Sequence, residues 1–219
     1  MAVSVVTALN PSPTYGQRYV DELRARLDAP LTVVHDTRWP GWWCKMAAFN
    51  PSAFEGSMLI MDLDTIPVGS VLPFIWSEPR CSMMLRDFYS PHRPASGVML
   101  ITEEDRAKVW EEWIKKPSDF MKRYRSLGDG GAIAEILGNV EFLQDNYPGL
   151  ICSYKVDCQN GTPHGVSLIC YHGRPRPHET GWDTGNAARH MEATKAPKPP
   201  AMALTLEQQR YAVHQNTRR

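Results

Sequence analysis

Two aspartates, Asp62 and Asp64, directly follow the apolar run MLIM (58–61), and only Leu63 separates them. Four apolar residues in a row are typical of a strand that is buried on both faces of a parallel sheet. Because residues i and i+2 of a strand point the same way, we expect both carboxylates on one face at the carboxyl end of this strand. In open α/β sheets that end borders the ligand crevice. Carboxylate oxygens there suit Mg²⁺ or Mn²⁺, although acids in a solvated turn remain the alternative.

Two chemistries place such a pair of acids behind a strand. In phosphoryl transfer of the haloacid-dehalogenase type, Asp62 would be the nucleophile and Asp64 the acid/base. In sugar transfer from a nucleotide diphosphate sugar, both acids hold a divalent ion that neutralises the departing diphosphate. The first fits only in part, because its DxDxT motif needs Thr where this chain has Ile66. Its motif also normally follows the first strand, whereas two strands are expected earlier in this chain.

A second group of candidate residues occurs late in the chain, in CYHGRPRPHE (170–179). His172 ends an apolar strand, and a histidine is a competent third ligand for Mn²⁺. Gly173 lets the backbone come close to a ligand. Arg174 and Arg176 offer forked donors to phosphate oxygens. This run therefore predicts a diphosphate-binding element.

The elements that must position these residues indicate an α/β fold. The strand 2–9, the helix 14–30 with an apolar stripe that begins at Tyr15, and the strand 31–35 form a βαβ unit, which predicts a parallel sheet. The other predicted strands are 80–85, 96–101 and 166–173. The other predicted helices are 41–49, 102–116 with Thr102 as its cap, 130–139 and 140–149. Composition changes after residue 185, so we expect one domain over 1–185 and a Pro-containing linker and tail over 186–219, with a short docking helix over 204–215.

Charge and cysteine usage narrow the class of protein. Lys plus Arg (24) equals Asp plus Glu (24), so the formal net charge is zero, which argues against an electrostatically driven nucleic-acid or membrane binder. No long apolar window or signal peptide is apparent, so no membrane span is expected. The five cysteines form no CxxC pair, which favours free buried cysteines and a reduced, cytoplasmic setting.

The ordered set WWCKMAAF, MLIMDLDTIPVGSV, ASGVML, GDGG, YPGLICSYK and CYHGRPRPH resembles the small GT-A-fold glycosyltransferases related to the glycogenin-like family, especially compact bacterial and phage-encoded members. The resemblance covers residues 1–182. It implies a single GT-A domain with a mostly parallel central sheet flanked by helices. It also implies metal-dependent, retaining transfer of a sugar from a nucleotide diphosphate donor, UDP-linked, to a hydroxyl acceptor. If the chain is phage-encoded, the setting would be the host cytoplasm.

The resemblance also implies roles for individual residues. Asp62, Asp64 and His172 would bind Mn²⁺ (or Mg²⁺), while Lys45 would reach the donor and Asp129 would lie near the sugar and acceptor as catalytic residues. The expected nucleotide-sugar contacts are, for the base, Thr7, Ala8 and Asp36; for the sugar, Ser96 and Gly97; and for the phosphates, Gly173, Arg174 and Arg176. The late motif is one residue shorter than the glycogenin-like His-x-Gly-x-x-Lys-Pro-Trp, so both arginines remain candidates for its lysine.

Several alternatives stay open at this point. Gly130 stands where the family commonly has Gln, so a non-catalytic nucleotide-sugar-binding protein is one alternative to an enzyme. Asp129 could simply cap a helix, and Lys45 could be a surface lysine. Lys155 could contact a sugar or phosphate, or lie at a solvated strand end. The acceptor could be a glycan, a protein, a small molecule or a modified DNA base.

Overall fold

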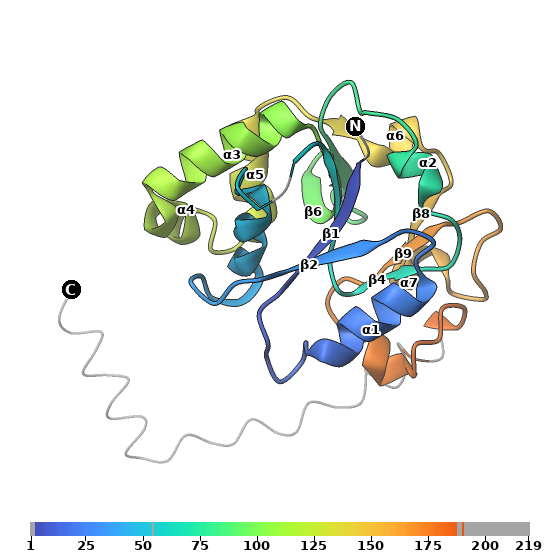
Figure 1. Cartoon of the computed structure of the whole chain (residues 1–219). Coiled ribbons are helices and arrows are strands. Elements are labelled where there is room, and N and C mark those ends of the chain that lie inside the picture. The colour runs from blue at the N-terminus through green and yellow to red at the C-terminus, as the bar shows by residue number, and fades with distance from the viewer. Residues whose placement is uncertain (1–2, 54, 188–189, 191–219) are drawn as a thin grey trace, which may run out of the picture.

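The computed structural model describes residues 3–53, 55–187 and 190, drawn in colour in Figure 1. The helix expected over 204–215 lies outside the described residues. The expected domain boundary between residues 185 and 186 stays a prediction.

The main sheet has six strands. Their order across the sheet is β2 (Leu31–His35), β1 (Ser4–Leu9), β3 (Met58–Met61), β6 (Pro94–Ile101), β5 (Met83–Arg86) and β7 (Glu141–Phe142). Only β6 runs against the others, since it pairs antiparallel with both β3 and β5. Strands β1 and β2 flank the helix α1 (Gln17–Arg26) and pair in parallel. The mostly parallel sheet and the βαβ unit are therefore confirmed.

A second, three-stranded sheet joins distant parts of the chain. It consists of β4 (Thr65–Pro67), β9 (Leu168–Cys170) and β8 (Ile151–Ser153) in that order. Strand β4 pairs antiparallel with β9, so Thr65 lies opposite Cys170, and β8 pairs with β9 in parallel. Strands β4 and β8 are not predicted from the sequence, because three-residue strands show little periodicity. This sheet brings the residue before β4, Asp64, next to the residues after β9.

The helices only partly follow the predicted boundaries. They are η1 (Gly41–Phe49), α2 (Leu72–Ile75), α3 (Glu103–Lys115), α4 (Pro117–Arg123), α5 (Gly128–Leu137), α6 (Leu143–Asn146), α7 (Tyr154–Asp157) and η2 (Pro177–Thr180). The predicted helix 41–49 exists but is a 3₁₀-helix. Thr102 caps α3 as expected, because its hydroxyl accepts from Asp105 N at 3.2 Å. The predicted helix 140–149 is wrong over its first residues, which form β7 before α6 begins.

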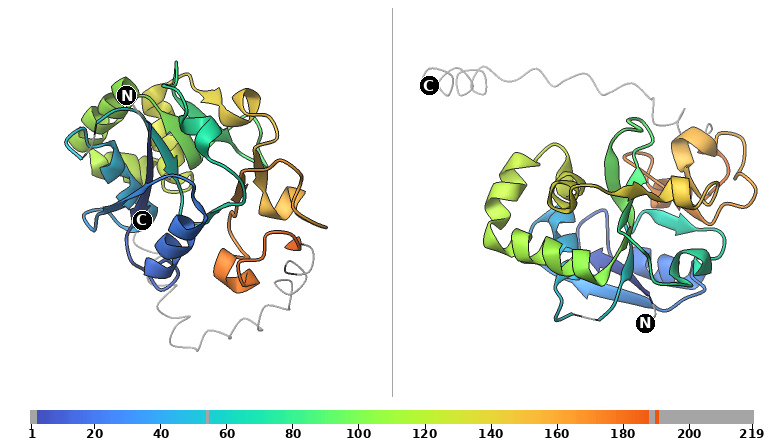
Figure 2. Two further views of the ribbon diagram at one scale, coloured as in Figure 1. Left: turned by 45° about the vertical axis from the view of Figure 1, so that its right-hand side comes forward. Right: turned by 90° about the horizontal axis from the view of Figure 1, so that it is seen from above.

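The two faces of the main sheet carry different layers (Figures 1 and 2). Helices η1, α3, α4 and α5 pack on one face, whereas α1, α2, α6 and the second sheet lie on the other. Strand β3 separates them: Met58 and Ile60 face the first layer, and Leu59 and Met61 face the second. All four are fully buried, so the prediction of a strand buried on both faces is confirmed.

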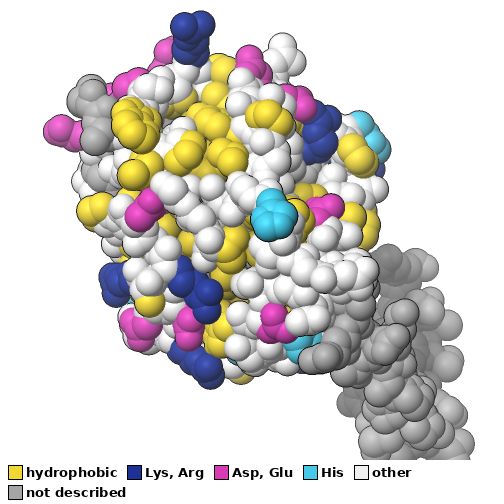
Figure 3. All heavy atoms as spheres, turned by 90° about the vertical axis from the view of Figure 1, so that its right-hand side faces the viewer, with side chains coloured by type: hydrophobic (Ala, Val, Ile, Leu, Met, Phe, Trp, Pro, Cys, Tyr) yellow, Lys and Arg dark blue, Asp and Glu magenta, His cyan; other side chains and the backbone are white. Residues whose placement is uncertain are grey.

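The cysteines match the expectation of free, buried thiols. All five cysteines are free, and all but Cys81 are buried. On the face drawn in Figure 3, positive and negative side chains are interspersed among apolar ones, with no basic stripe on that face. Within the described residues, no helix has the length and apolarity that crossing a bilayer requires.

Candidate active site

Asp62 and Asp64 lie in the turn that joins β3 to β4, not on β3 itself. Thr65 N donates to Asp62 O at 3.0 Å, and Asp62 N donates to Gly97 O at 2.8 Å. The expectation that strand alternation aligns the two carboxylates was therefore wrong. Both side chains nevertheless line one cavity.

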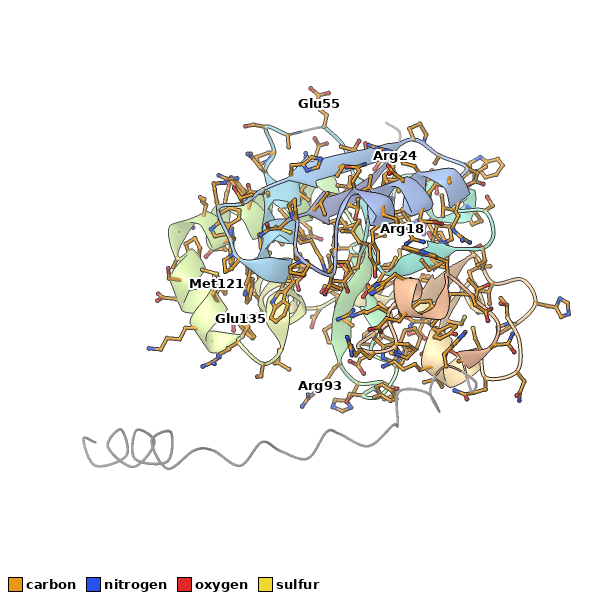
Figure 4. The ribbon with its side chains drawn as sticks, turned by 90° about the horizontal axis from the view of Figure 1, so that it is seen from below. Arg18, Arg24, Glu55, Arg93, Met121 and Glu135 are labelled. Carbon is orange, nitrogen blue, oxygen red and sulfur yellow. The ribbon has the colours of Figure 1, made fainter. Side chains whose placement is uncertain are left out.

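That cavity has a volume of about 630 Å³. Its walls come from the β3–β4 turn, the β5–β6 hairpin, the α4–α5 connection and the segment after β9. Six of the predicted site residues line it: Asp62, Asp64, Ser96, Gly97, His172 and Arg176. Arg93 also lines it; in Figure 4 this residue lies at the outer end of the β5–β6 hairpin, between the side of α4 and α5 and the C-terminal segments.

Lys45 is a buried cation behind the cavity wall. Its Nζ lies 2.6 Å from Asp62 Oδ1 and 2.7 Å from Asp129 Oδ2, and it donates to Ser96 O at 3.0 Å. Burial disfavours the ammonium, but Asp129 and Asp62 together raise the pKa of Lys45 above its ordinary value. Lys45 is 4% exposed, so the alternative of a surface lysine is wrong. The N-cap of α5 is Leu127, whereas Asp129 lies within the first turn and pairs with Lys45, so the alternative that Asp129 caps the helix is wrong.

Asp64 is shared between two partners from opposite ends of the chain. Its Oδ2 accepts from the Tyr15 hydroxyl at 2.7 Å and also from the Arg176 guanidinium, which lies 5.3 Å from the centre of the Tyr15 ring. Burial raises the pKa of Tyr15, and the charge of Asp64 raises it further. Burial also raises the pKa of Asp64, although Tyr15 and Arg176 oppose that shift. Sequence reasoning missed Tyr15 because it assigned the residue to the packing stripe of a helix.

His172 lines the same cavity as a neutral ring. Its Nε2 lies 2.6 Å from Ser153 Oγ, and its ring stacks on Phe88 at 5.4 Å and meets the edge of Tyr89 at 4.9 Å. Burial, together with the charge of Lys155, lowers the pKa of His172 to about 4. The ring is therefore uncharged at neutral pH, the form in which imidazole binds a metal.

The donor set fits a divalent cation in part. Burial raises the pKa of Asp62 to about 7, so a cation beside it would favour its charged form. Two adjacent carboxylates are ligands that Mg²⁺ and Mn²⁺ prefer. Within the described residues, however, no group of three His, Cys, Asp or Glu side chains could hold an ion as placed. The ring of His172 faces Ser153, and Arg176 is bound to Asp64.

The residues expected around the nucleotide base do not line this cavity. Thr7 is fully buried and donates its hydroxyl to Met61 O at 2.8 Å. Asp36 accepts from Arg38 Nε at 2.8 Å and from its Nη2 at 2.6 Å. Ala8 lies on β1 opposite Val34 of β2. These three residues thus lie on or directly after β1 and β2 and do not line the cavity, although Thr7 contacts Met61, the residue before Asp62.

The two late arginines have different surroundings. Arg176 enters the cavity, whereas the side chain of Arg174 is 77% exposed and pairs with Glu179 at 2.9 Å. Gly173, between His172 and Arg174, does not line the cavity and has φ +71°, a conformation that favours glycine. Gly130 does line it, and a Cβ there would lie 3.2 Å from Ser96 Oγ. A glutamine at this position would therefore push against the wall that Ser96 forms.

Comparison with known proteins identifies the fold. The chain aligns with the glycosyltransferase GlyE of Streptococcus pneumoniae at a TM-score of 0.57 and 14% identity, over 89% of this chain and 61% of that one. An active-site mutant of LgtC aligns at 0.56 and 12% identity, over 91% of this chain and 98% of that chain. A glycosyltransferase involved in glycosylation of the major capsid of PBCV-1 aligns at 0.56 and 12% identity, over 88% and 100%.

These alignments show that the fold is that of GT-A-type glycosyltransferases, as expected. The chain spans only about three-fifths of the length of the GlyE structure, but almost the full length of the other two. No protein-family model matches the chain, and no curated protein matches it in sequence.

Proposed function

We propose that this chain is a metal-dependent glycosyltransferase that moves a sugar from a nucleotide diphosphate donor, UDP-linked, to a hydroxyl acceptor. One observation carries the proposal: Asp62, Asp64, His172 and Arg176 come from two segments more than a hundred residues apart and line a single cavity on a glycosyltransferase fold. One solved LgtC structure is described as a galactosyltransferase in complex with donor and acceptor sugar analogs, which supports a nucleotide-sugar reaction for this fold.

Different residues would bind the cation and the phosphates. Asp62 and Asp64 would hold the cation, with His172 as its third ligand once the ring turns from Ser153. When bound, the divalent cation would supply electrophilic stabilisation of the departing diphosphate. Arg176 would leave Asp64 for a phosphate oxygen, to which its guanidinium can donate two hydrogen bonds.

Lys45 and Asp129 act behind the cavity wall. Lys45 fixes the carboxylate of Asp62 and holds the Ser96 carbonyl, while Asp129 neutralises the second side of the ammonium. We therefore assign Asp129 a positioning role through Lys45 rather than contact with the acceptor. The hydroxyl acceptor and the retaining stereochemistry of the transfer are taken from the family resemblance alone.

The direct test of the site is binding of UDP in the presence of Mn²⁺ to an Asp64→Ala variant. Because the carboxylate is a proposed ligand, metal-dependent UDP affinity should be lost. Asp119→Ala, an exposed acid on α4, is the matched control and should bind as the unmodified chain does. Unchanged UDP affinity in Asp64→Ala would show that this cavity is not the donor site.

The phosphatase alternative gains no support from the described residues. Ile66, where that motif needs a hydroxyl, is 1% exposed in the core, and the two acids follow the third strand of the chain. A beryllofluoride adduct trapped on Asp62 would nevertheless reinstate it. A non-catalytic binding protein would bind a nucleotide sugar without ever releasing the sugar.

A further inference from the structure

Lys155 is a cation next to Gly173, outside the residues that line the cavity, and the fold explains its position. It lies in α7 immediately after β8, while Gly173 follows β9. Strands β8 and β9 pair in parallel, with Ser153 opposite Cys170. Because parallel strands end at the same edge, the residues just after them come together. Ser153 reinforces this arrangement, since its hydroxyl accepts from Val156 N at 3.1 Å and contacts the ring of His172.

The Lys155 ammonium lies over the bare backbone of Gly173. A Cβ at Gly173 would be 3.2 Å from Lys155 Nζ, so a side chain there would compete with the lysine for space. The charge of Lys155 also interacts with two residues that line the cavity, Arg176 and His172. Burial is the largest cause of the lowered pKa of Lys155, and the charge of Arg176 is the second. Burial is likewise the largest cause of the lowered pKa of His172, and the charge of Lys155 is the second.

The cations around the site differ in how they are neutralised. Lys45 pairs with Asp62 and Asp129, and Arg176 pairs with Asp64. The ammonium of Lys155, by contrast, has no hydrogen bond or ion pair to any side chain in the part of the chain that the structure describes. A half-buried ammonium beside a second cation is unfavourable unless an anion joins it. The flexible four-carbon stem of a lysine allows it to reach such an anion.

We propose that Lys155 is a phosphate-binding residue and that, with Arg176, it clamps the diphosphate of the donor on the two sides of Gly173. This inference rests on the proposed function, because the anion is taken to be the diphosphate of a nucleotide sugar. It decides between the two roles that the sequence left open for Lys155, and it adds a residue of α7, outside the late motif, to the phosphate contacts. The absence of a side chain at Gly173 then permits both its left-handed backbone conformation and the close approach of the Lys155 ammonium.

Calorimetry on the full chain with four nucleoside diphosphates, UDP, GDP, ADP and TDP, in the presence of Mn²⁺ tests the proposal. Lys155→Met removes the charge and keeps the length of the side chain. Lys115→Met is the matched control, because Lys115 is an exposed lysine at the end of α3 that already pairs with Glu112. Lys155→Arg restores the charge. Thermal melting checks that each variant is folded.

We expect Lys155→Met to weaken binding of the preferred diphosphate about 10- to 100-fold, the size of one lost charge-assisted contact. The corresponding nucleoside without phosphates, followed by NMR titration, should bind Lys155→Met and the unmodified chain equally. Lys155→Arg should recover part of the loss, and Lys115→Met should lose nothing.

Two outcomes would overturn the inference while leaving the proposed function intact. One is an unchanged diphosphate affinity in a folded Lys155→Met variant. The other is an equal loss for the nucleoside, which would indicate a general disturbance of the pocket. If the unmodified chain binds none of the four diphosphates, the proposed function itself fails, and the inference fails with it.

Discussion

The cavity and the β1–β2 edge both place a buried or half-buried aspartate and a cation after a parallel strand, yet they are built differently. At the edge, Asp36 is closed by Arg38, two residues further along the chain. At the cavity, Asp62 and Asp64 depend on Lys45, Tyr15 and Arg176, which come from three separate segments. Local closure satisfies the polar group within its own segment. Polar groups contributed by distant segments around an open space can be rearranged when a ligand arrives.

The largest difference between the two regions should be in stability. Removing one partner of a buried ion pair leaves an uncompensated charge, so Lys45→Met should lower the free energy of unfolding by about 3–5 kcal/mol. The side chain of Arg38 is 56% exposed, so Arg38→Met should lower it by about 1 kcal/mol or less. Urea unfolding of both variants measures the contrast. Equal losses would mean that Lys45 is no more essential to the fold than a surface arginine.

A second contrast concerns pH in the absence of added metal. The pKa of Asp62 is about 7 in the folded chain and 3.8 as its ordinary value, so the folded state binds more protons between these pH values. This contribution to stability is present below pH 3.8 and is lost as the pH rises through 7. Asp62→Asn removes this buried charge but leaves Lys45 paired with Asp129, so it should melt about 2–4 °C above the unmodified chain at pH 8 and show little difference at pH 4.

Asp36→Asn is the control for that measurement. It removes an ion pair at the β1–β2 edge and should show no stabilisation at pH 8. If Asp62→Asn also failed to gain stability at pH 8, burial would not be disfavouring the charge of Asp62, and the argument that the site favours a cation would be lost.

The smallest effect should come from freeing Asp64. Tyr15→Phe removes the hydroxyl that donates to Asp64 and keeps the ring, so Mn²⁺ should bind a few-fold more tightly. Tyr19→Phe is the matched control, because the Tyr19 hydroxyl contacts His178 Nδ1 instead. Calorimetric titration with Mn²⁺ compares the two. Weaker binding in Tyr15→Phe would indicate that the hydroxyl supports the metal site rather than competing with it.

The sequence predicted which segments meet at the cavity better than it predicted the turn, the short strand and the side-chain contacts that form it. MLIM and the run before His172 are apolar enough to be recognised as strands, and the residues behind them do meet in one cavity. The turn at Asp62 and the three-residue strand β4 were missed, because pairing with β9 rather than local pattern determines them. Tyr15 and Ser153 were missed for the same reason: each acts through a partner at least nineteen residues away.

For the residues expected to contact the nucleotide base, the strands could be predicted from the sequence but the side-chain partners could not. Thr7, Ala8 and Asp36 were assigned to the nucleotide base by the family resemblance, and the two strands that carry or precede them are confirmed. Their side-chain partners could not be predicted, because the hydroxyl of Thr7 bonds to the carbonyl of Met61 on a neighbouring strand. Whether a nucleotide base reaches these residues stays a prediction.

The measurement that tests the central claim most directly is nucleotide release from a panel of UDP-, GDP-, ADP- and TDP-sugars with Mn²⁺. A double variant, Asp62→Ala with Asp64→Ala, is the control. The account predicts slow release of one nucleotide, the UDP of a UDP-sugar, which is lost in the double variant. Release that persists in the double variant, or turnover of a generic phosphate ester with no release from any donor, would contradict it.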